Sequence, residues 1–475
     1  MTEPRHLDLA IIGAGVAGTY IADAVKQAQP DWSIALFERR DKIGGRLRSV
    51  AVPGVDHKIE LGGMRYLTTQ RRVQSIIDAF DIPTHLFDRT DGTQRSYLRG
   101  RFGDGPADPR AGDGYDLTDH ERGRSADDLI MRAFQQILPG AGSLSAEAYV
   151  LARASATYRD RRLIDWTVGE ALSTLLSPEG VRFATDAFGY DSGGRLFNVG
   201  DHIPFRLGGN DPNEEARTPD DGMDAIPRAL TARFEGRGGF VHLRSELQAI
   251  HIDGDLQRLQ FADGVSVEVK RTVITAPIPA LRRLAAASPV LRAPEFADVL
   301  DSVEGFAAMK LYLWYERPWW RPEVSGIRTT TDLPLSKVFY VDTARDAPAT
   351  LLAMYSDHRN VDPWLELAGS ASDGMAAPEA MLAEVQRELR TLHPEGRDIP
   401  APAGSALMHW GADPLEVAWT FWRPGYISDE IMAVAPQPDP AVGIHLAGET
   451  FSHAQSWIEG ALESADPVIE RLSAG

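Results

Sequence analysis

Residues 7–18 read LDLAIIGAGVAG, and this stretch decides the fold of the N-terminal part of the chain. The apolar run at residues 7–12 is typical of a buried parallel strand. The following segment, VAGTYIADAVKQA at residues 16–28, has apolar residues at helical spacing, and SIALFE at residues 33–38 predicts a second buried strand. The sequence therefore predicts a βαβ unit.

Three glycines mark the turn between the first strand and the helix. Gly13, Gly15 and Gly18 match the pattern G-x-G-x-x-G, and Glu38 follows Gly18 by 20 residues at the end of the next strand. The glycines allow the backbone to approach a pyrophosphate, and the helix N-terminus offers free amides and a positive dipole. A carboxylate at the position of Glu38 can accept both ribose hydroxyls, so the unit is predicted to bind a dinucleotide.

Two further segments favour a flavin dinucleotide over a nicotinamide one. The pair ending in Gly45, followed by Arg46, fits a second loop at the pyrophosphate, although a glycine turn with a surface arginine is the alternative. Near the C-terminus, Gly448 and Glu449 follow a predicted buried strand, and a helix is expected to begin near Trp457. Glu449 can bind ribityl hydroxyls, and the helix start can stabilise negative charge on a reduced flavin.

Composition excludes several other classes of protein. The 475 residues predict two or three domains, and the net charge of −19 argues against nucleic acid as a partner. The absence of cysteine excludes disulfides, thiolate metal sites and flavin attachment through cysteine, and the 12 histidines show no metal-ligand spacing. No membrane span or signal peptide is visible, so no membrane contact and a cytoplasmic location are expected.

The chain resembles the flavin-dependent amine oxidase family, and more narrowly its L-amino-acid oxidases. The resemblance covers most of the chain and is carried by GAGVAG, ERRDKIGGR, ELGGMRY, DGMDAIPRAL, MKLYLWYERPWW, TTTDLPLSKVFY and LAGETFSHAQSWIEGALES. It implies an α/β fold with a Rossmann-type FAD-binding domain, a mixed-sheet substrate domain and a helical insertion. The implied division assigns residues 1–67, 222–290 and 440–475 to FAD binding, 68–110, 206–221 and 291–439 to substrate binding, and 111–205 to the helical insertion.

In similar enzymes the glycine pair of ELGGMRY, here Gly62 and Gly63, lies under the flavin ring. The arginine that follows, Arg65, then points into the substrate cavity and binds a carboxylate. Chemistry supports this role because a guanidinium forms two parallel charge-assisted bonds to a carboxylate and keeps its proton. The alternative is a structural arginine paired with an acid such as Glu60.

Two residues of the predicted substrate domain complete the expected chemistry. Tyr340 matches the tyrosine that gives the same carboxylate a hydroxyl hydrogen bond, and a buried strand tyrosine is the alternative. Lys310 lies in the apolar strand AAMKLYL, where a lysine needs a partner or a task. Similar enzymes use a lysine here to hold a water against the flavin; the alternative is a lysine that reaches solvent from an edge strand.

Three aromatic or imidazole side chains are candidates for the cavity wall. Trp457 matches the aromatic residue in front of the flavin, and Trp419 is the candidate for the opposite wall, although either could be a core tryptophan. His202 lies roughly where some L-amino-acid oxidases carry a histidine proposed as a base, and a structural histidine is the alternative.

Together these features predict a noncovalent FAD enzyme that converts an L-amino acid and oxygen to a 2-oxo acid, ammonia and hydrogen peroxide. The expected catalytic residues are Lys310, Arg65, Tyr340 and Trp457, and a homodimer is common among similar enzymes. The predicted cofactor contacts are Gly13, Gly15, Gly18, Glu38, Arg39, Gly45, Arg46, Gly62, Gly63, Met64, Arg65, Leu247, Gly448, Glu449, Trp457 and Ile458. An amino-acid 2-monooxygenase, an amine or polyamine oxidase and a noncatalytic carrier of the same fold are the alternatives.

Overall fold

The computed structural model describes residues 6–87, 94–207, 214–320, 328–341, 347–394 and 398–474. Residues 1 and 475, which are the outer limits of the predicted FAD-binding domain, lie outside these ranges. Residues 208–213 of the predicted substrate-binding domain also lie outside them.

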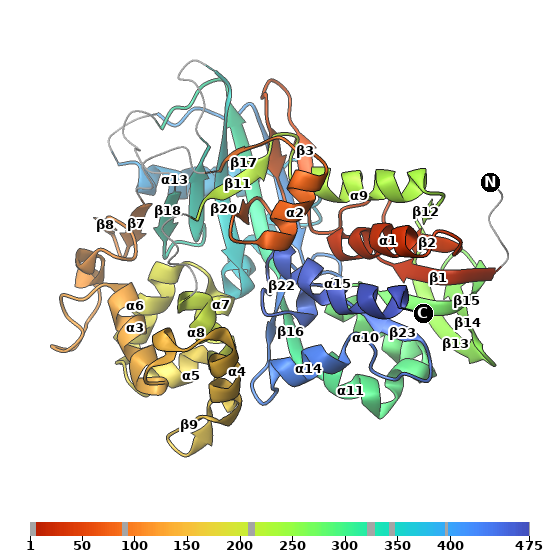
Figure 1. Ribbon diagram of the computed structural model, residues 1–475. Coiled ribbons are helices and arrows are strands. Elements are labelled where there is room, and N and C mark those ends of the chain that lie inside the picture. Colours follow the sequence, from red (N-terminus) through yellow and green to blue (C-terminus); the bar gives the residue numbers. More distant parts are fainter. Residues whose placement is uncertain are drawn as a thin grey trace.

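A seven-stranded sheet forms the part of the molecule that contains the N-terminus (Figure 1). Its order is β12-β2-β1-β15-β14-β13, with β23 pairing to β15. Four pairings are parallel, and β13-β14-β15 is an antiparallel meander. The strands are β1 (His6–Ile12), β2 (Ile34–Phe37), β12 (Phe240–His242), β13 (Leu247–Asp253), β14 (Leu256–Phe261), β15 (Ser266–Ile274) and β23 (Ile444–Leu446). The predicted βαβ unit is confirmed.

Helices from both ends of the chain lie side by side next to this sheet. Helix α1 (Val16–Ala28) packs against α15 (Ile458–Ser473) and α9 (Ala225–Gly236), as Figure 1 shows. The Tyr20 hydroxyl donates a 3.3 Å bond to Asp466, which ties α1 to α15 directly. The C-terminal helix therefore completes the N-terminal layer.

A second seven-stranded sheet has the order β21-β17-β20-β19-β18-β7-β8. All its pairings are antiparallel except β18-β7, so the sheet is mixed. The strands are β7 (Gln94–Leu98), β8 (Arg101–Gly103), β17 (Ala308–Tyr315), β18 (Arg328–Thr331), β19 (Lys337–Tyr340), β20 (Ala349–Asp357) and β21 (Gly404–Trp410). Two such sheets confirm the predicted α/β fold class, whereas the domain limits stay a proposal.

A group of helices lies at the lower left of Figure 1, beside the second sheet. It contains α3 (Ala126–Ile137), α4 (Ala146–Ser155), α5 (Val168–Ser173), α6 (Pro178–Phe188), α7 (Asp191–Arg195) and α8 (Val199–Leu207). Ser125 caps α3 by accepting a bond from the Asp128 amide. Phe197 stacks on Phe421 with ring centres 4.2 Å apart, so this group shares a core with the rest of the protein.

The remaining elements connect these three parts. The helices are α2 (Arg71–Ala79), α10 (Ile278–Ala287), α11 (Pro294–Asp301), α12 (Asp362–Ala368), α13 (Glu379–Leu392) and α14 (Ser428–Val434). The strands are β3 (Ser49–Ala51), β4 (Lys58–Glu60), β5 (Tyr66–Leu67), β6 (Thr84–Leu86), β9 (Thr157–Tyr158), β10 (Arg161–Arg162), β11 (Ala216–Pro219), β16 (Val303–Phe306) and β22 (Trp419–Trp422).

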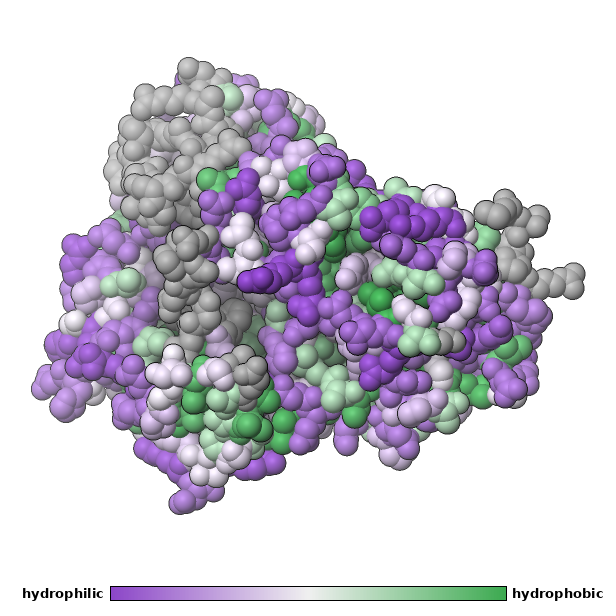
Figure 2. Space-filling view, viewed as in Figure 1, coloured by the Kyte–Doolittle hydropathy of each residue, from purple (hydrophilic) through white to green (hydrophobic). Residues whose placement is uncertain are grey.

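On the face shown in Figure 2 hydrophilic side chains cover most of the surface, and hydrophobic ones gather in small groups, chiefly low in the view. Within the described ranges no helix combines the length and the hydropathy needed to cross a membrane.

Candidate functional site

Two adjoining cavities lie where both ends of the chain meet the second sheet. The first cavity holds most of the predicted cofactor contacts: Gly13, Gly15, Glu38, Arg39, Gly45, Arg46, Gly62, Gly63, Leu247, Gly448, Glu449, Trp457 and Ile458. The second cavity adjoins it and is lined by Met64 and Arg65. Gly62, Gly63, Tyr355, Trp419 and Trp457 line both cavities, so these residues mark the junction.

Close backbone approach requires a glycine at position 18, just after the turn that follows β1. A Cβ atom on Gly18 would lie 1.9 Å from the Gly13 carbonyl oxygen, so Gly18 permits helix–strand packing and does not line the first cavity. A Cβ on Gly45 would lie 3.1 Å from the Cα of Gly15. The second glycine loop therefore packs directly on the first, and both expose backbone to the first cavity.

Glu38 is buried at the end of β2 and is fixed by backbone. Its carboxylate accepts 2.8 Å bonds from the amides of Ala14 and Arg40. Burial raises the pKa of the Glu38 carboxyl, and these two amide bonds act in the opposite direction. Glu38 is thus oriented at the edge of the first cavity, as binding of a ribose requires.

Arg39 lines the first cavity but is also held by two acids. Its guanidinium pairs with Asp413 at 2.6 Å and with Glu416 at 2.5 Å. Glu416 also accepts a 2.7 Å bond from Arg40 Nε. These contacts join the end of β2 to the segment before β22 and close one end of the first cavity.

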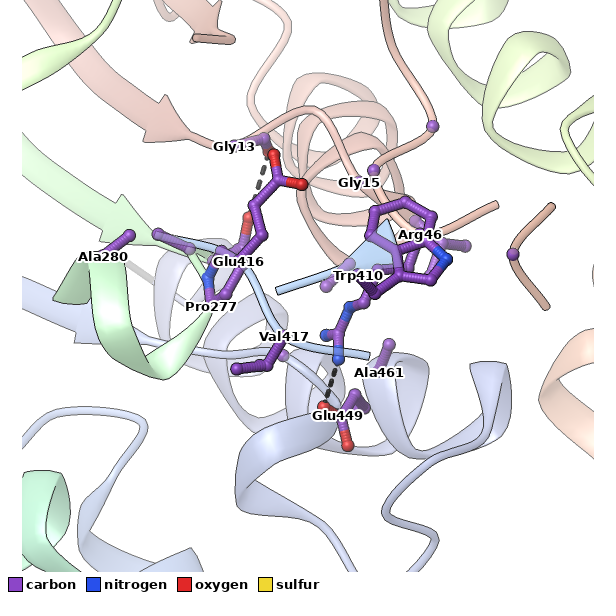
Figure 3. A pocket seen from close by; sticks show the side chains of 18 of the residues that line it. Gly13, Gly15, Arg46, Pro277, Ala280, Trp410, Glu416, Val417, Glu449 and Ala461 are labelled. Carbon is purple, nitrogen blue, oxygen red and sulfur yellow. Dashed lines mark hydrogen bonds and ion pairs between the residues drawn. The ribbon is translucent and has the colours of Figure 1, made fainter. Parts of the chain in front are cut away.

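Arg46 and Glu449 point toward one another across the first cavity, as Figure 3 shows. Glu449 also accepts bonds from the Thr420 hydroxyl at 3.2 Å and the Ser456 amide at 2.9 Å. The predicted N-terminal and C-terminal cofactor residues are therefore in direct contact. Sequence spacing does not predict this contact, because 403 residues separate Arg46 from Glu449.

Lys310 is buried on the wall of the first cavity, beside Gly62 at the junction. Its Nζ donates to the carbonyl oxygens of Gly62 at 2.5 Å and Glu60 at 3.2 Å, and it lies 4.5 Å from the centre of the Tyr355 ring. Burial lowers the pKa of Lys310 to about 7, with the nearby Glu60 carboxylate opposing this. Lys310 is thus a central lysine of the site and does not reach solvent.

The guanidinium of Arg65 lies over Phe87, 5.1 Å from the ring centre. Among the residues that the structure describes, Arg65 has no hydrogen bond or ion pair, so Glu60 is not its partner. Glu60 instead accepts bonds from Ser49 and the Met223 amide. Arg65 is a planar cation on the wall of the second cavity.

Tyr340 lies outside both cavities, contrary to the prediction that it contacts the same carboxylate as Arg65. Its hydroxyl is 3.0 Å from His393 Nε2 and 3.2 Å from Thr329 Oγ1, and its ring belongs to the core between the second sheet and α13. The cause is the alternation of β19: Lys337 lines the second cavity, so Tyr340, three residues later, faces the other side of the sheet.

Trp457 and Trp419 both reach the junction, and their action as opposite walls stays a prediction. Trp457 precedes the first turn of α15, and Trp419 in β22 donates a 3.2 Å bond to Ser192 Oγ. His202 lines the second cavity, but its buried ring packs edge-on against three phenylalanines, which is typical of a core histidine.

Sequence reasoning did not identify Tyr190, Tyr355, Arg328 or Lys337, all of which line the second cavity. The ring centre of Tyr190 lies 5.4 Å from that of Tyr355 and 6.0 Å from that of Trp419. Lys337 carried a signal, because a lysine at the start of the apolar strand KVFY needs an explanation in the same way as Lys310.

A model of the flavin containing amine oxidoreductase family matches residues 17–468 of the chain. The chain belongs to this family. Membership makes it a flavin-dependent oxidoreductase for a small-molecule amine or amino acid, with oxygen as the acceptor, and confirms the predicted family.

Similar proteins extend over almost the whole chain. Aplysianin-A from Aplysia kurodai is 27% identical over 517 residues, which covers 98% of this chain and 90% of that protein. An L-amino-acid oxidase from Mus musculus is 23% identical over 489 residues, covering 98% and 70%. A solved structure of wild-type putrescine oxidase bound to putrescine has a TM-score of 0.75 at 17% identity and covers 99% of both chains, which shows a shared fold.

Proposed function

We propose that the protein oxidatively deaminates an L-amino acid, using FAD. The observation that carries this proposal is Arg65: a guanidinium on the cavity wall, one residue beyond Met64 and two beyond Gly63, with no described hydrogen-bond or ion-pair partner. A guanidinium in this setting suits a carboxylate, which it binds with two parallel charge-assisted bonds. A simple amine brings no such group.

The first cavity fits FAD. Its backbone is exposed at Gly15 and Gly45, where side chains would obstruct a pyrophosphate, and α1 and α15 both begin at its wall. Glu38 supplies the ribose acceptor, and no cysteine is present for covalent attachment through sulfur. When bound, FAD would supply the redox chemistry, as a two-electron acceptor for the hydride of the substrate that oxygen reoxidises.

The protein residues provide positioning and control of water. Arg65 fixes the α-carboxylate, which turns the Cα–H bond toward the wall formed by Gly62 and Gly63. Trp419 and Trp457 limit the access of water at the junction. The substrate amine must be neutral for its lone pair to assist departure of the hydride.

Lys310 can hold or release a proton near neutral pH. Its pKa, lowered to about 7 by burial, places Nζ close to equal populations of the amine and the ammonium form. The carbonyl oxygens of Gly62 and Glu60 accept from Nζ and fix its position beside the first cavity. The oxidised substrate leaves as an imino acid, which water converts to the 2-oxo acid and ammonia.

The test is a peroxide-coupled assay of the purified holoenzyme across the twenty L-amino acids, together with their D-enantiomers and decarboxylated amines. Peroxide, ammonia and a 2-oxo acid in equal amounts, from L-amino acids only, support the proposal. An amide with carbon dioxide would instead identify a monooxygenase. Equal turnover of an amine and its parent amino acid would identify an amine oxidase.

A further inference from the structure

Glu60 and Lys310 are two buried ionisable groups whose charges act on one another. The Nζ atom of Lys310 donates a 3.2 Å bond to the backbone carbonyl of Glu60, which holds the end of β4 beside β17. Burial is the largest influence on both groups: it raises the pKa of Glu60 to about 7 and lowers the pKa of Lys310 to about 7. The Lys310 ammonium lowers the pKa of Glu60, and the Glu60 carboxylate raises the pKa of Lys310, so the two charges lie within electrostatic range. One proton can therefore reside on either group near neutral pH.

A third cavity, of about 380 Å³, gives Glu60 a route to solvent. Glu60 lines this cavity, whereas Lys310 lines the first cavity. The lining of the third cavity includes the exposed residues Asp56, Leu86 and Asp220, so the third cavity reaches the surface. Bound FAD and substrate would occupy the first and second cavities and leave the third open. Glu60 therefore lies between the lysine of the cofactor site and a separate path to water.

The hydrogen bonds of Glu60 suit both of its protonation states. Its carboxylate accepts a 2.9 Å bond from the Met223 amide and a 2.8 Å bond from the Ser49 hydroxyl. The same hydroxyl accepts a 3.1 Å bond from the Asp224 amide. A hydroxyl has one donor and two acceptor positions, so Ser49 donates to the ionised form of Glu60 and can accept from the protonated form. Glu60 can therefore gain a proton without losing its contact to Ser49.

Groups from several elements surround Lys310. The positive charge of Arg65 lowers the pKa of Lys310, and the Met64 sulfur lies 3.7 Å from Nζ. The centre of the Tyr355 ring lies 4.5 Å from Nζ, and burial raises the pKa of this phenol well above its usual value, so the phenol keeps its proton. Glu60 supplies the negative charge that opposes the influence of Arg65.

Glu60 is also influenced by charges other than that of Lys310. The negative charge of Asp224 raises the pKa of Glu60, and Lys58, two residues earlier in β4, pairs with Asp221 at 2.7 Å. Burial and the charge of Glu60 raise the pKa of Tyr312, so this phenol stays neutral. The ionisable side chains that line the third cavity together with Glu60 are those of Asp56, His57, Lys58, His85, Asp220, Tyr312 and Tyr340. The lining therefore offers polar side chains to a proton that leaves Glu60.

Oxidation of an amine by oxygen moves one proton out of the site and one proton back. A substrate ammonium loses one proton to give the neutral amine from which the hydride departs. Oxygen, the hydride and one proton together make hydrogen peroxide. The site therefore needs groups that take up and return one proton in each turnover, for an amine and for an amino acid alike.

We propose that Glu60 relays this proton between Lys310 and the third cavity. In the outward step an N–H bond of the Lys310 ammonium breaks, its electron pair stays on nitrogen, and an O–H bond forms on the Glu60 carboxylate. Because Nζ bonds the backbone carbonyl of Glu60, the transfer to the carboxylate uses one bridging water. The ionic pair becomes a neutral pair with no change in net charge, so no buried charge is left without compensation. The inward step is the reverse, and Glu60 is a positioning residue because it acts through Lys310.

The first test is the pH dependence of the two flavin half-reactions in Glu60→Gln, followed by stopped-flow absorbance with any substrate that the wild-type holoenzyme oxidises. Glutamine keeps an oxygen for the Met223 amide but cannot take up the proton. Loss of the carboxylate charge should move the Lys310 midpoint to lower pH by about one unit. The half-reaction that depends on the proton should slow about tenfold. KM should stay close to the wild-type value, because Glu60 lies outside the second cavity.

Glu388→Gln is the matched control for this test. Glu388 is buried, burial raises its pKa to about 7 as it does for Glu60, and its carboxylate accepts a 3.2 Å bond from the Leu335 amide. Glu388 lies outside the linings of all three cavities, so its variant should keep the wild-type midpoint. A pH profile of Glu60→Gln that coincides with that of the wild type overturns the relay. Because the test accepts an amine or an amino acid, a failure to oxidise amino acids refutes the proposed function and leaves the relay to be judged by its own result.

The second test needs neither a variant nor a substrate, and it covers the case in which Glu60→Gln does not fold. Infrared difference spectra are recorded between the oxidised and the chemically reduced wild-type holoenzyme at neutral pH, with and without an isotopic label in the glutamate carboxyl carbons. Negative charge on the reduced cofactor favours the ammonium form of Lys310, which draws the proton from Glu60. The carbonyl band of a protonated carboxyl should therefore decrease on reduction, and the label should shift this band. A difference spectrum with no label-sensitive carboxyl band overturns the relay, as does a band that persists unchanged in a folded Glu60→Gln.

Discussion

The Nζ atom of Lys310 donates a 2.5 Å hydrogen bond to the carbonyl oxygen of Gly62, 248 residues earlier in the chain. This contact attaches strand β17 of the second sheet to the glycine pair between the two cavities. The lysine expected to work beside the cofactor is therefore held by the same backbone that the cofactor would rest on.

Replacing Lys310 with methionine should slow one flavin half-reaction about 100-fold. Methionine keeps a similar side-chain length but removes the amine that can hold or release a proton there. Stopped-flow absorbance, with anaerobic reduction by substrate and then reoxidation by oxygen, identifies which half-reaction changes. FAD content should equal that of the wild type. Unaltered rates in both half-reactions would contradict a catalytic role for Lys310.

The stability of the protein should depend on pH through Lys310. Its pKa is lowered from 10.5 to about 7 in the folded state, so between these values the unfolded chain holds a proton that the folded one lacks. Lys310 therefore makes the free energy of unfolding rise with pH from about 7 to 10. Below pH 7 the buried amine is protonated in the folded protein, and the loss of stability that this causes is fully present. Urea unfolding of Lys310→Met should show a flatter dependence in this window, and an identical slope would contradict the lowered pKa.

Glu60 should give the free energy of unfolding the opposite dependence on pH, over a lower pH range. Burial raises its pKa from 4.5 to about 7, so the folded protein holds the extra proton between these values and stability falls as pH rises through them. Glu60→Gln should remove this slope in urea unfolding from pH 5 to 7. A surface change such as Glu384→Gln is the control and should leave the slope in place.

Replacing Arg65 with alanine should raise KM for amino acids about 100-fold, equivalent to roughly 3 kcal/mol, because a charge-assisted pair with the α-carboxylate is lost. Steady-state kinetics and the ratio of flavin to protein absorbance check this together. Arg387→Ala, at an exposed ion pair with Glu384, is the matched control. Unchanged kinetics in Arg65→Ala would remove Arg65 from substrate binding.

Replacing Glu38 with alanine should weaken FAD binding about 10- to 100-fold, the effect of losing a hydrogen bond to a charged group. The dissociation constant can be measured by flavin fluorescence during titration of the apoprotein. A variant that keeps its full affinity would show that the ribose contact is misassigned.

Tyr340→Phe should leave KM for amino acids close to the wild-type value, because Tyr340 lies outside both cavities. It should lower the free energy of unfolding by about 1 kcal/mol through loss of the hydroxyl contacts to His393 and Thr329. Kinetics and urea unfolding separate the two effects, and a steep rise in KM with unaltered stability would restore the original expectation.

The N-terminal glycine turn could be predicted from local signals in the sequence. A Cβ on Gly18 would clash with the Gly13 carbonyl, and Gly13 has a φ of +102°. Glu38 follows in the next strand, so this arrangement depends on short segments. Arg46 and Glu449 were each predicted to contact the cofactor from a local motif, but their direct pairing was not predicted.

Tyr340 shows where such reasoning fails. A strand alternates its faces at every residue, so a shift of one position moves a side chain from the cavity to the core, and sequence alone does not fix that register. Tyr190 and Lys337 were missed for another reason: they belong to separate elements, and only the packing of the helices against the second sheet brings them together.

The dependence of the first cavity on residues 448–461 has a consequence for biosynthesis. A nascent chain that has emerged from the ribosome only as far as β21 has the glycine turn and Glu38 but lacks Glu449, Trp457 and the α15 wall. Tight capture of the coenzyme must therefore follow translation of this late segment, so a truncated translation product would remain colourless and exposed to proteolysis.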